Sequence, residues 1–550
     1  MNTNANTNTN SNRIVNPILN GFNPDPSIIR VGDDYYIATS TFEWFPGVQI
    51  HHSRDLRNWR LLTHPLTRRS QLDMLGNPNS GGIWAPCLSY SDGTYYLIYT
   101  DVKSHIGPFK DTHNYLVTAT DITGPWSDPV FLNSSGFDPS LFHDEDGRKW
   151  LVNLVWDHRK GRNKFGGILI QEYDAQERKL VGPIRNIFGG TPLGLTEGPH
   201  LYRRGEYYYL LTAEGGTRWN HAVTIARSES LFGPYEVDPA NPMLTSKDNP
   251  ELPLQRAGHG DLVETQSGEW YMVHLCGRPL ASSRTCNLGR ETAIQKVEWT
   301  SDGWLRLAGG GNAPQLEVEA PAGLAEQPFD EHAHGVGVDH FDEPALGIHL
   351  NTLREPADEA WLSLRERPGY LRLFGRDSFS SAHGQSLVAR RQQAFAAEAE
   401  TVVAFEPDTH QQMAGLVYYY NAKNWYYLRI SRDETIGKSL TIMTSDQGQY
   451  DEPLEREVSV DGWERVYLKL TLDHERAQFH YSADGAAWTA IGPVLDAGRM
   501  SDEHVETKRG GVLLDQGFTG AFVGVCVQDL SGARKHADFD YLSYRELDPI

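Results

Sequence analysis

Cysteine is scarce in this chain, with only four among 550 residues. None of Cys87, Cys276, Cys286 and Cys526 belongs to a CxxC pair, which argues against a structural zinc site. So few thiols in so long a chain favour a reducing compartment. Metal ligation by cysteine is therefore not expected to organise this protein.

Long apolar runs are also missing. No stretch reaches the roughly 18 apolar residues that a membrane-spanning helix needs. The N-terminus, MNTNANTNTNSN, is polar and has no apolar core of a secretory signal, so residues 1–13 are predicted to form a disordered tail. A cytoplasmic protein is the expected setting.

Positive charge is in deficit, because the net charge is −22. Nucleic acids and anionic membranes require a basic surface, so both are disfavoured as partners. Neutral ligands are unaffected by this charge. Aromatic residues are plentiful, with 14 Trp, 25 Tyr and 20 Phe, which is typical of β-rich cores and leaves open stacking against sugar rings.

One pattern recurs along the first 310 residues: a turn, two bulky residues, then an apolar run. Its second bulky residues are 54–63 positions apart, and the pattern is typical of strand starts. No helical pattern of useful length separates the copies. The copies are GDDYYIATS, DGTYYLIYT, DGRKWLVNL, RGEYYYLLT and SGEWYMVHL, with markers Tyr36, Tyr96, Trp150, Tyr208 and Tyr271.

A second recurrence lies 11 or 12 residues before each marker. It consists of the pentapeptides DPSII, WAPCL, DPSLF, EGPHL and HGDLV. Five repeats of short strands predict a five-bladed β-propeller, over residues 14–310, in which each pentapeptide opens the innermost strand. The leading residues are then expected to converge on one axis; the alternative is five unrelated turn residues. They are Asp25, Trp84, Asp138, Glu197 and His259.

The pattern stops after about residue 310. Residues 311–328 are rich in Gly, Pro and Ala and are predicted to be a linker. Residues 329–550 contain regularly spaced alternating strands, such as AGLVYYY and RVYLKLTL, which predict a β-sandwich. The fold class is therefore all-β.

Three acids in the predicted ring indicate acid–base chemistry. Neighbouring carboxylates raise one another's pKa, and a pair with separated pKa values divides the roles of general acid and base, as glycoside hydrolysis requires. A hard-cation site is the competitor, but calcium loops place their acids within about a dozen residues. A structural cation near His259 stays open as an alternative. Pro24 and Pro26 are predicted to hold Asp25 in a stiff, extended segment.

Five motifs, in order, resemble glycoside hydrolase family 43: NPDPS, IWAP, FDPSLF, TEGPHLY and LGRETAIQK. The resemblance covers the chain from about residue 14 to near its end and is strongest to β-xylosidases with a C-terminal sandwich domain. It implies an inverting five-bladed propeller followed by a concanavalin-like β-sandwich, with no cofactor required for catalysis.

The resemblance also implies residue roles. Asp25 would be the general base, Glu197 the general acid, and Asp138 the residue that tunes and orients the acid. On chemical grounds Arg290, whose guanidinium stays charged and donates bidentately, is expected to keep Asp138 ionised or to bind sugar hydroxyls. The substrate-binding residues would be Phe42 and Trp84 as apolar walls, His259 and Arg290 as the floor, and Phe518 reaching in from the sandwich.

Two positions depart from the family pattern. Cys87 stands where many relatives carry an acid that would support the pocket. The segment 279–289, with ASSRTCNLG, is short and is expected to border the site, where it would affect substrate preference or subunit contacts.

The resulting expectation is an exo-acting β-xylosidase that releases xylose from the non-reducing end of β-1,4-xylo-oligosaccharides with inversion. The alternatives are an α-L-arabinofuranosidase, or an enzyme with both activities, and a non-catalytic sugar-binding propeller. The family also suggests a homodimer or homotetramer.

Overall fold

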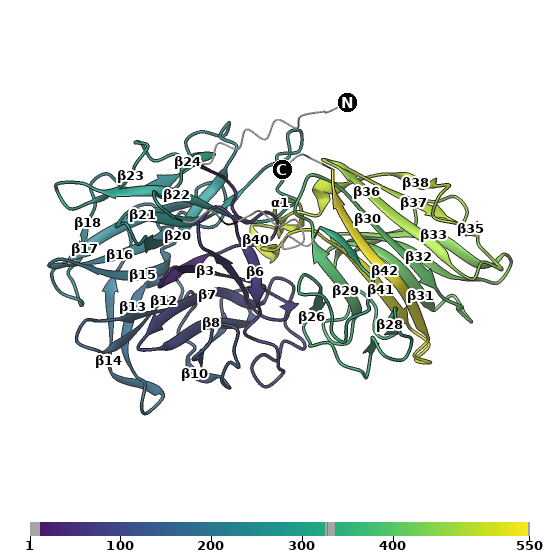
Figure 1. Cartoon of the computed structure of the whole chain (residues 1–550), viewed down its shortest axis with the longest axis horizontal. Helices are drawn as coiled ribbons and strands as arrows, with labels where there is room; N and C mark the ends of the chain where they lie inside the picture. Colours follow the sequence, from purple (N-terminus) through teal and green to yellow (C-terminus); the bar gives the residue numbers. More distant parts are fainter. Residues whose placement is uncertain (1–11, 325–326, 328–335, 548–550) are drawn as a thin grey trace.

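The computed structural model describes residues 12–324, 327 and 336–547. Figure 1 shows two lobes, one made of five small sheets and the other of two larger sheets packed together. Almost every element is a strand, so the all-β prediction of a propeller followed by a sandwich is confirmed. Within the described part of the chain, no helix is long and apolar enough to cross a membrane.

Five antiparallel sheets form the blades, and the innermost strand of each contacts those of its two neighbours, which closes the ring. The blades are β2 (Ser27–Val31), β3 (Asp34–Thr39), β5 (Gln49–Ser53) and β6 (Arg60–Thr63); β7 (Gly82–Ser91), β8 (Thr94–Ser104), β9 (Asp111–Ala119) and β10 (Val130–Asn133); β11 (Ser140–His143), β12 (Lys149–Trp156), β13 (Phe165–Asp174) and β14 (Lys179–Phe188); β15 (Glu197–Arg204), β16 (Tyr207–Glu214), β17 (Ala222–Ser228) and β18 (Glu236–Val237), with β19 (Leu244–Thr245) beside β17; and β20 (Gln255–Glu264), β21 (Trp270–Gly277), β22 (Glu291–Trp299) and β23 (Leu305–Leu307).

The recurring sequence patterns occupy the first two strands of each blade. The pentapeptides lead into the inner strands β2, β7, β11, β15 and β20, and the turn-plus-aromatic patterns form β3, β8, β12, β16 and β21. The shared sequence phase therefore corresponds to a shared position in space.

Two large sheets form the second lobe. One contains β27 (Leu362–Ser363), β28 (Leu371–Phe374), β42 (His536–Glu546), β30 (Ala396–Ala404), β36 (Val466–Asp473), β37 (Arg476–Ser482) and β38 (Thr489–Asp496), with β25 (Gly337–Asp339) beside β42. The other contains β34 (Gln449–Asp451), β33 (Gly437–Asp446), β32 (Asn424–Asp433), β31 (Gln412–Asn421), β41 (Phe522–Asp529), β29 (Ser386–Arg391), β26 (Asn351–Leu353) and β4 (Trp44–Phe45), with β35 (Val458–Ser459) beside β33.

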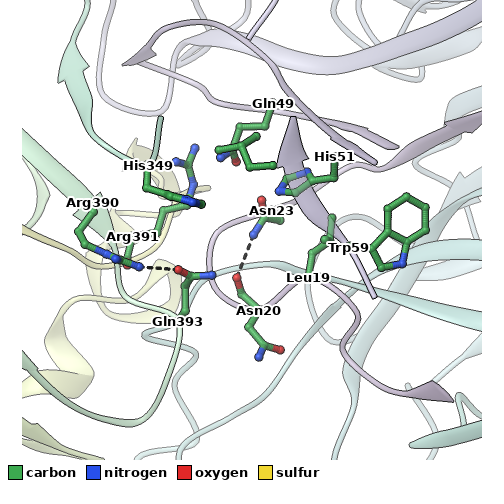
Figure 2. Close-up of a pocket in the computed structure, with 11 residues that line it drawn as sticks. Leu19, Asn20, Asn23, Gln49, His51, Trp59, His349, Arg390, Arg391 and Gln393 are labelled. Atoms are coloured by element: carbon green, nitrogen blue, oxygen red, sulfur yellow. Dashed lines mark hydrogen bonds between the residues drawn. The ribbon is translucent and has the colours of Figure 1, made fainter. Parts of the chain in front are cut away.

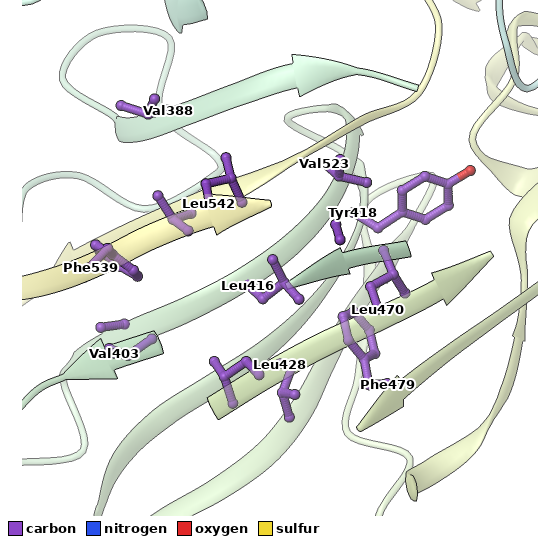
Figure 3. Close-up of a cluster of buried hydrophobic side chains, with 14 of the residues drawn as sticks. Val388, Val403, Leu416, Tyr418, Leu428, Leu470, Phe479, Val523, Phe539 and Leu542 are labelled. Carbon is purple, nitrogen blue, oxygen red and sulfur yellow. The ribbon is translucent and has the colours of Figure 1, made fainter. Parts of the chain in front are cut away.

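Alternating apolar side chains from the two sheets meet in the sandwich core. Figure 3 shows Leu416, Leu428 and Val523 of one sheet together with Leu470 and Phe539 of the other. All five are buried. Burial of this apolar surface is the main source of stability for such a lobe.

Short elements connect the lobes. They are α1 (Asp502–Val505), the 3-10 turn η2 (Ala497–Arg499) and the hairpin of β39 (Thr507–Arg509) and β40 (Val512–Asp515). Ser501 caps α1 by accepting a hydrogen bond from the His504 amide.

The structure differs from the predicted domain limits at two places. The predicted linker contains β24 (Glu317–Glu319), which pairs with β1 (Arg13–Val15), so Arg13 is part of a strand; residues 1–11 of the predicted tail lie outside the described residues. β4 lies within the propeller sequence but pairs with β26 of the sandwich. The sequence predicted that the propeller and the sandwich are separate in the chain, whereas the pairing of β4 with β26 joins the two lobes.

Candidate active site

The five leading residues of the pentapeptides line one cavity of about 550 Å³. Asp25 and Asp138 lie just before β2 and β11, Glu197 begins β15, and Trp84 and His259 lie within β7 and β20. The predicted convergence on one axis is what the structure shows. The other predicted site residues, Phe42, Arg290 and Phe518, line the same cavity.

The backbone at three of these positions is left-handed rather than extended. The φ angles of Asp25, Asp138 and His259 are 55°, 53° and 49°. The prediction of an extended Asp25 between two prolines was therefore wrong. Asp and His tolerate this region better than most residues, and tertiary contacts hold such conformations in place. For Asp25 these are the contacts that its side-chain carboxylate makes with Ser40 and Arg290.

The Asp25 carboxylate is buried and has two side-chain partners. Ser40 Oγ donates a hydrogen bond to Oδ2 at 2.7 Å, and Arg290 Nη1 pairs with Oδ1 at 3.1 Å. The same Ser40 hydroxyl accepts from the Ala85 amide at 2.8 Å. Blades one and two thus hold the carboxylate in a fixed orientation.

Arg290 connects Asp25 to the sandwich. Its Nη2 donates to the Phe518 carbonyl at 2.9 Å, and its Nη1 donates to Thr217 Oγ1 at 3.0 Å. The direct ion-pair partner of Arg290 is Asp25, whereas the sequence suggested Asp138. The fifth blade brings Arg290 to the Asp25 side of the pocket, a position that sequence order does not reveal.

Asp138 and Glu197 form the second acidic centre. Burial, then the charges of Asp138 and Asp25, raises the pKa of Glu197 well above its usual range. Burial and the Asp25 charge also raise the pKa of Asp138. Asp138 Oδ2 accepts from the Gly198 amide at 3.0 Å, so it contacts the residue next to Glu197. A raised carboxyl pKa is the property that a general acid requires.

Lys110 is a site residue that the sequence analysis missed. Its Nζ donates to the His105 carbonyl at 2.8 Å and lies 4.5 Å from the centre of the Trp156 ring. Burial lowers the pKa of Lys110 to about 8, against an opposing effect of Glu197. Its positive charge in turn lowers the pKa of Glu197.

Three aromatic rings from separate segments form an apolar wall. The ring centres of Phe42, Trp84 and Phe518 are 5.4–6.1 Å apart. The Phe518 amide donates to Ser80 Oγ at 3.0 Å, and the Trp84 indole donates to the Ser80 carbonyl at 2.9 Å. Aromatic faces beside polar groups are the surfaces on which sugar rings pack.

Several other lining residues lie on connections between strands, so blade phase gave no signal for them. Thr217 and Arg218 directly follow the glycine pair Gly215 and Gly216 at the end of β16. The sandwich supplies three more from the β39–β40 hairpin and the segment after it. The missed residues include His105, Lys110, Trp156, Phe165, Leu195, Thr217, Arg218, His221, Val512, Leu513 and Gln516.

The two departures from the family pattern lie outside the cavity walls. Cys87 is buried and lines a different cavity together with His200 and Asp261. Burial and the Asp261 charge raise the pKa of its thiol to about 12. The segment 279–289, described in full, contacts the sandwich instead, where the Ser282 amide donates to Glu475 Oε1 at 2.9 Å.

The alternative of a structural cation near His259 finds no support. Among residues 12–324, 327 and 336–547, no group of three or more His, Cys, Asp or Glu side chains is arranged to hold a metal ion. Burial lowers the pKa of His259 to about 4, so this imidazole is a neutral floor for the pocket near neutral pH.

A propeller whose axis presents three carboxylates beside an aromatic wall defines a glycosidase that works by carboxyl chemistry. Comparison with known proteins identifies the family of this glycosidase. Residues 14–305 match Glycosyl hydrolases family 43, and residues 338–545 match the Beta xylosidase C-terminal Concanavalin A-like domain. The chain belongs to glycosyl hydrolase family 43.

Full-length relatives share both lobes. The chain is 52% identical over 547 residues to "Xylosidase/arabinosidase 43B" of Humicola insolens, covering 97% of this chain and 98% of that protein. It is 52% identical over 543 residues to "Beta-xylosidase" of Bacillus subtilis, covering 97% and 100%. The crystal structure of xylan beta-1,4-xylosidase from Bacillus halodurans C-125 superposes with a TM-score of 0.93 at 59% identity, covering 97% of this chain and 100% of that one.

Proposed function

We propose that this glycosidase is an inverting, exo-acting β-xylosidase that removes xylose from the non-reducing end of β-1,4-xylo-oligosaccharides. The observation that carries the proposal is the division of the acids within one cavity. Glu197 has a raised pKa, whereas Asp25 accepts a hydrogen bond from Ser40 and forms an ion pair with Arg290. The names of the similar full-length proteins supply the sugar.

The chemistry follows from these environments. Asp25 takes a proton from water, whose oxygen forms a bond to the anomeric carbon of the sugar. The bond from that carbon to the glycosidic oxygen breaks, and Glu197 donates its proton to the departing oxygen. Attack from the face opposite the leaving group inverts the configuration. Side chains supply both proton transfers, so this mechanism needs no cofactor.

Exo action is supported by the shape of the site. Phe42, Trp84 and Phe518 form one wall, and the lining also includes His259 and Arg290, which are almost fully buried, as expected at the inner end of a pocket. A pocket closed at one end accepts the terminus of a chain rather than its middle. The sandwich completes the pocket through Phe518, so the second lobe is part of the substrate site.

The first test asks whether Glu197 is the general acid. Glu197→Ala is expected to reduce kcat/KM for xylobiose by about 10²–10⁴-fold, the usual value of a general acid. Loss on an aryl xyloside should be far smaller, because its leaving group needs little protonation. Steady-state kinetics on both substrates measures the ratio, and equal losses would remove Glu197 from the acid role.

A second test addresses the alternative of a non-catalytic sugar-binding propeller. Asp25→Ala is expected to abolish turnover of both xylobiose and the aryl xyloside, because both reactions need an activated water. Binding of xylose to the variant, followed by calorimetry, is expected to persist. Retained turnover would contradict the base assignment.

An α-L-arabinofuranosidase activity is the second candidate. It is favoured by one observation, the double name of the Humicola insolens relative at 52% identity. The comparison of kcat/KM on xylobiose and on an arabinofuranosyl substrate decides between the two; a higher value for the arabinofuranosyl substrate would reverse our ranking.

A cytoplasmic location and a homodimeric or homotetrameric state stay predictions. The first rests on the scarce cysteines and the second on the family resemblance. Cell fractionation and sedimentation measure them directly.

A further inference from the structure

A second cavity, of about 30 Å³, lies between the two lobes and away from the catalytic acids (Figure 2). The propeller contributes the segment from Leu19 to Asn23 and the strand β5, and the sandwich contributes β29 and residues near it. Among the described residues that form its walls, none is Asp or Glu, although two are arginines. The cavity is therefore a buried, cationic space with room for about one water molecule or one small ion.

Arg391 carries the charge that defines this space. Its side chain is 5% exposed. Its Nε donates to the Phe22 carbonyl at 2.8 Å and its Nη1 donates to Asn351 Oδ1 at 2.7 Å. Its Nη2 is buried and has no hydrogen-bond partner. Both of these hydrogen-bond acceptors, the Phe22 carbonyl and the Asn351 amide oxygen, are neutral.

Arg390 adds a second positive charge beside that of Arg391. Arg390 precedes Arg391 on β29, is also 5% exposed and lines the same cavity. Its Nη2 donates to Gln393 Oε1 at 2.6 Å, and burial lowers its pKa although the charge of Glu546 acts in the opposite direction. Burial and the Arg390 charge lower the pKa of Arg391, which is the direction that a nearby anion would reverse. A water molecule would satisfy Nη2 but would leave the buried charge uncompensated.

Gln49 supplies the opposite side of the cavity. It begins β5, is 3% exposed, and its Oε1 has no hydrogen-bond partner. Figure 2 shows its amide and the Arg391 guanidinium turned toward the same space. Because the two ends of an amide have nearly the same shape, a flip of this group would present N–H donors to the cavity.

We propose that this cavity binds one small monovalent anion of the size of chloride, held by Arg391 Nη2 and the Gln49 amide. The anion would supply the missing countercharge and join the two lobes. Arg391 also holds the carbonyl of Phe22, three residues before Asp25, and the Phe22 ring lies 5.7 Å from that of Phe42. Anion binding would thus stabilise the docked lobes behind the catalytic base.

Bromide is the probe for the site itself. Crystals of the full chain, prepared without chloride and soaked in sodium bromide, are expected to show an anomalous difference peak in the cavity beside Arg391 Nη2. An ordered water with no anomalous signal at this position would overturn the proposal.

Thermal unfolding tests whether the anion matters in solution. Sodium chloride, compared with sodium gluconate at equal ionic strength, is expected to raise Tm by about 2–4 °C with a saturating dose response. A linear response of the same size with every salt would indicate a general salt effect and contradict a specific site.

Gln49→Glu builds a carboxylate into the cavity. The variant is expected to have a higher Tm than wild type in gluconate and to lose the chloride response. Gln176→Glu, at an exposed turn, makes the same change in net charge and is expected to keep the wild-type response. A full chloride response in Gln49→Glu would refute the assignment even if the crystals contain bromide.

Discussion

The carboxyl groups proposed as catalytic differ in their surroundings, and those surroundings would set their chemistry. Asp25 faces Arg290 and a hydroxyl, whereas Glu197 faces Asp138 and a partly apolar wall. This difference between two carboxyl groups of similar chemistry supports the proposed division into a base and an acid. Lys110 adds a positive charge that acts on Glu197 in the opposite sense to Asp138.

Opposite shifts of the pH profile test this arrangement. A general acid must be protonated, so activity is lost as pH rises through its pKa. The Asp138 charge raises the pKa of Glu197, so Asp138→Asn is expected to move the alkaline limb of the kcat/KM profile to lower pH, by on the order of one unit. The pKa read from this limb belongs to the interacting carboxyl groups together rather than to Glu197 alone.

The Lys110 charge lowers the pKa of Glu197, so Lys110→Met is expected to move the same limb to higher pH, by about a few tenths of a unit. Lys160→Met, at an exposed position, is the control and should leave the profile unchanged. Shifts of the same sign in Asp138→Asn and Lys110→Met would show that charge at Glu197 does not control the limb.

At the scale of elements, one segment of the sandwich determines how the pocket closes. Residues 516–521 connect β40 to β41 and carry Phe518 into the propeller. The segment approaches Gly289 so closely that a Cβ on Gly520 would lie 2.7 Å from the Leu288 carbonyl oxygen. The short 279–289 segment therefore supports the segment that carries Phe518. It borders the site in this way although none of its residues lines the cavity.

Gly520→Ala is expected to push this segment away from the propeller. Displacement of Phe518 by even part of an ångström misplaces the Arg290 hydrogen bonds and the aromatic wall, so kcat/KM should fall by about 10²-fold. Gly189→Ala, where a Cβ meets nothing within 4 Å, is the matched control. Steady-state kinetics with a Tm measurement distinguishes this from general unfolding; an unchanged kcat/KM would show that the segment adapts.

At the scale of the whole molecule, the two lobes share a core. β4 pairs with β26, and the Trp44 ring stacks on Phe522 at 3.8 Å between centres. Arg256, fully buried in the propeller, pairs with Asp502 of the sandwich at 2.8 Å. A buried pair of this kind is costly to break because a lone charge would remain.

Trp44→Ala is expected to lower the free energy of unfolding by about 3–5 kcal/mol, the usual cost of emptying a buried aromatic site. Because Trp44 belongs to both lobes, calorimetry should show one transition shifted as a unit, with activity lost at the same temperature. A new, separate transition for the propeller would indicate that the lobes are stable independently.

The sequence by itself determined the blades, the sandwich and the convergence of Asp25, Asp138 and Glu197, because repeat phase translates directly into position around an axis. The resemblance to glycoside hydrolase family 43 added Phe42, Arg290 and Phe518. Tertiary structure alone decided that Arg290 pairs with Asp25, that Asp25 has a left-handed backbone, and that Lys110 lies beside Glu197. It also decided that β4 joins the sandwich. Each of these depends on contacts between residues distant in sequence, which local preference and periodicity do not encode.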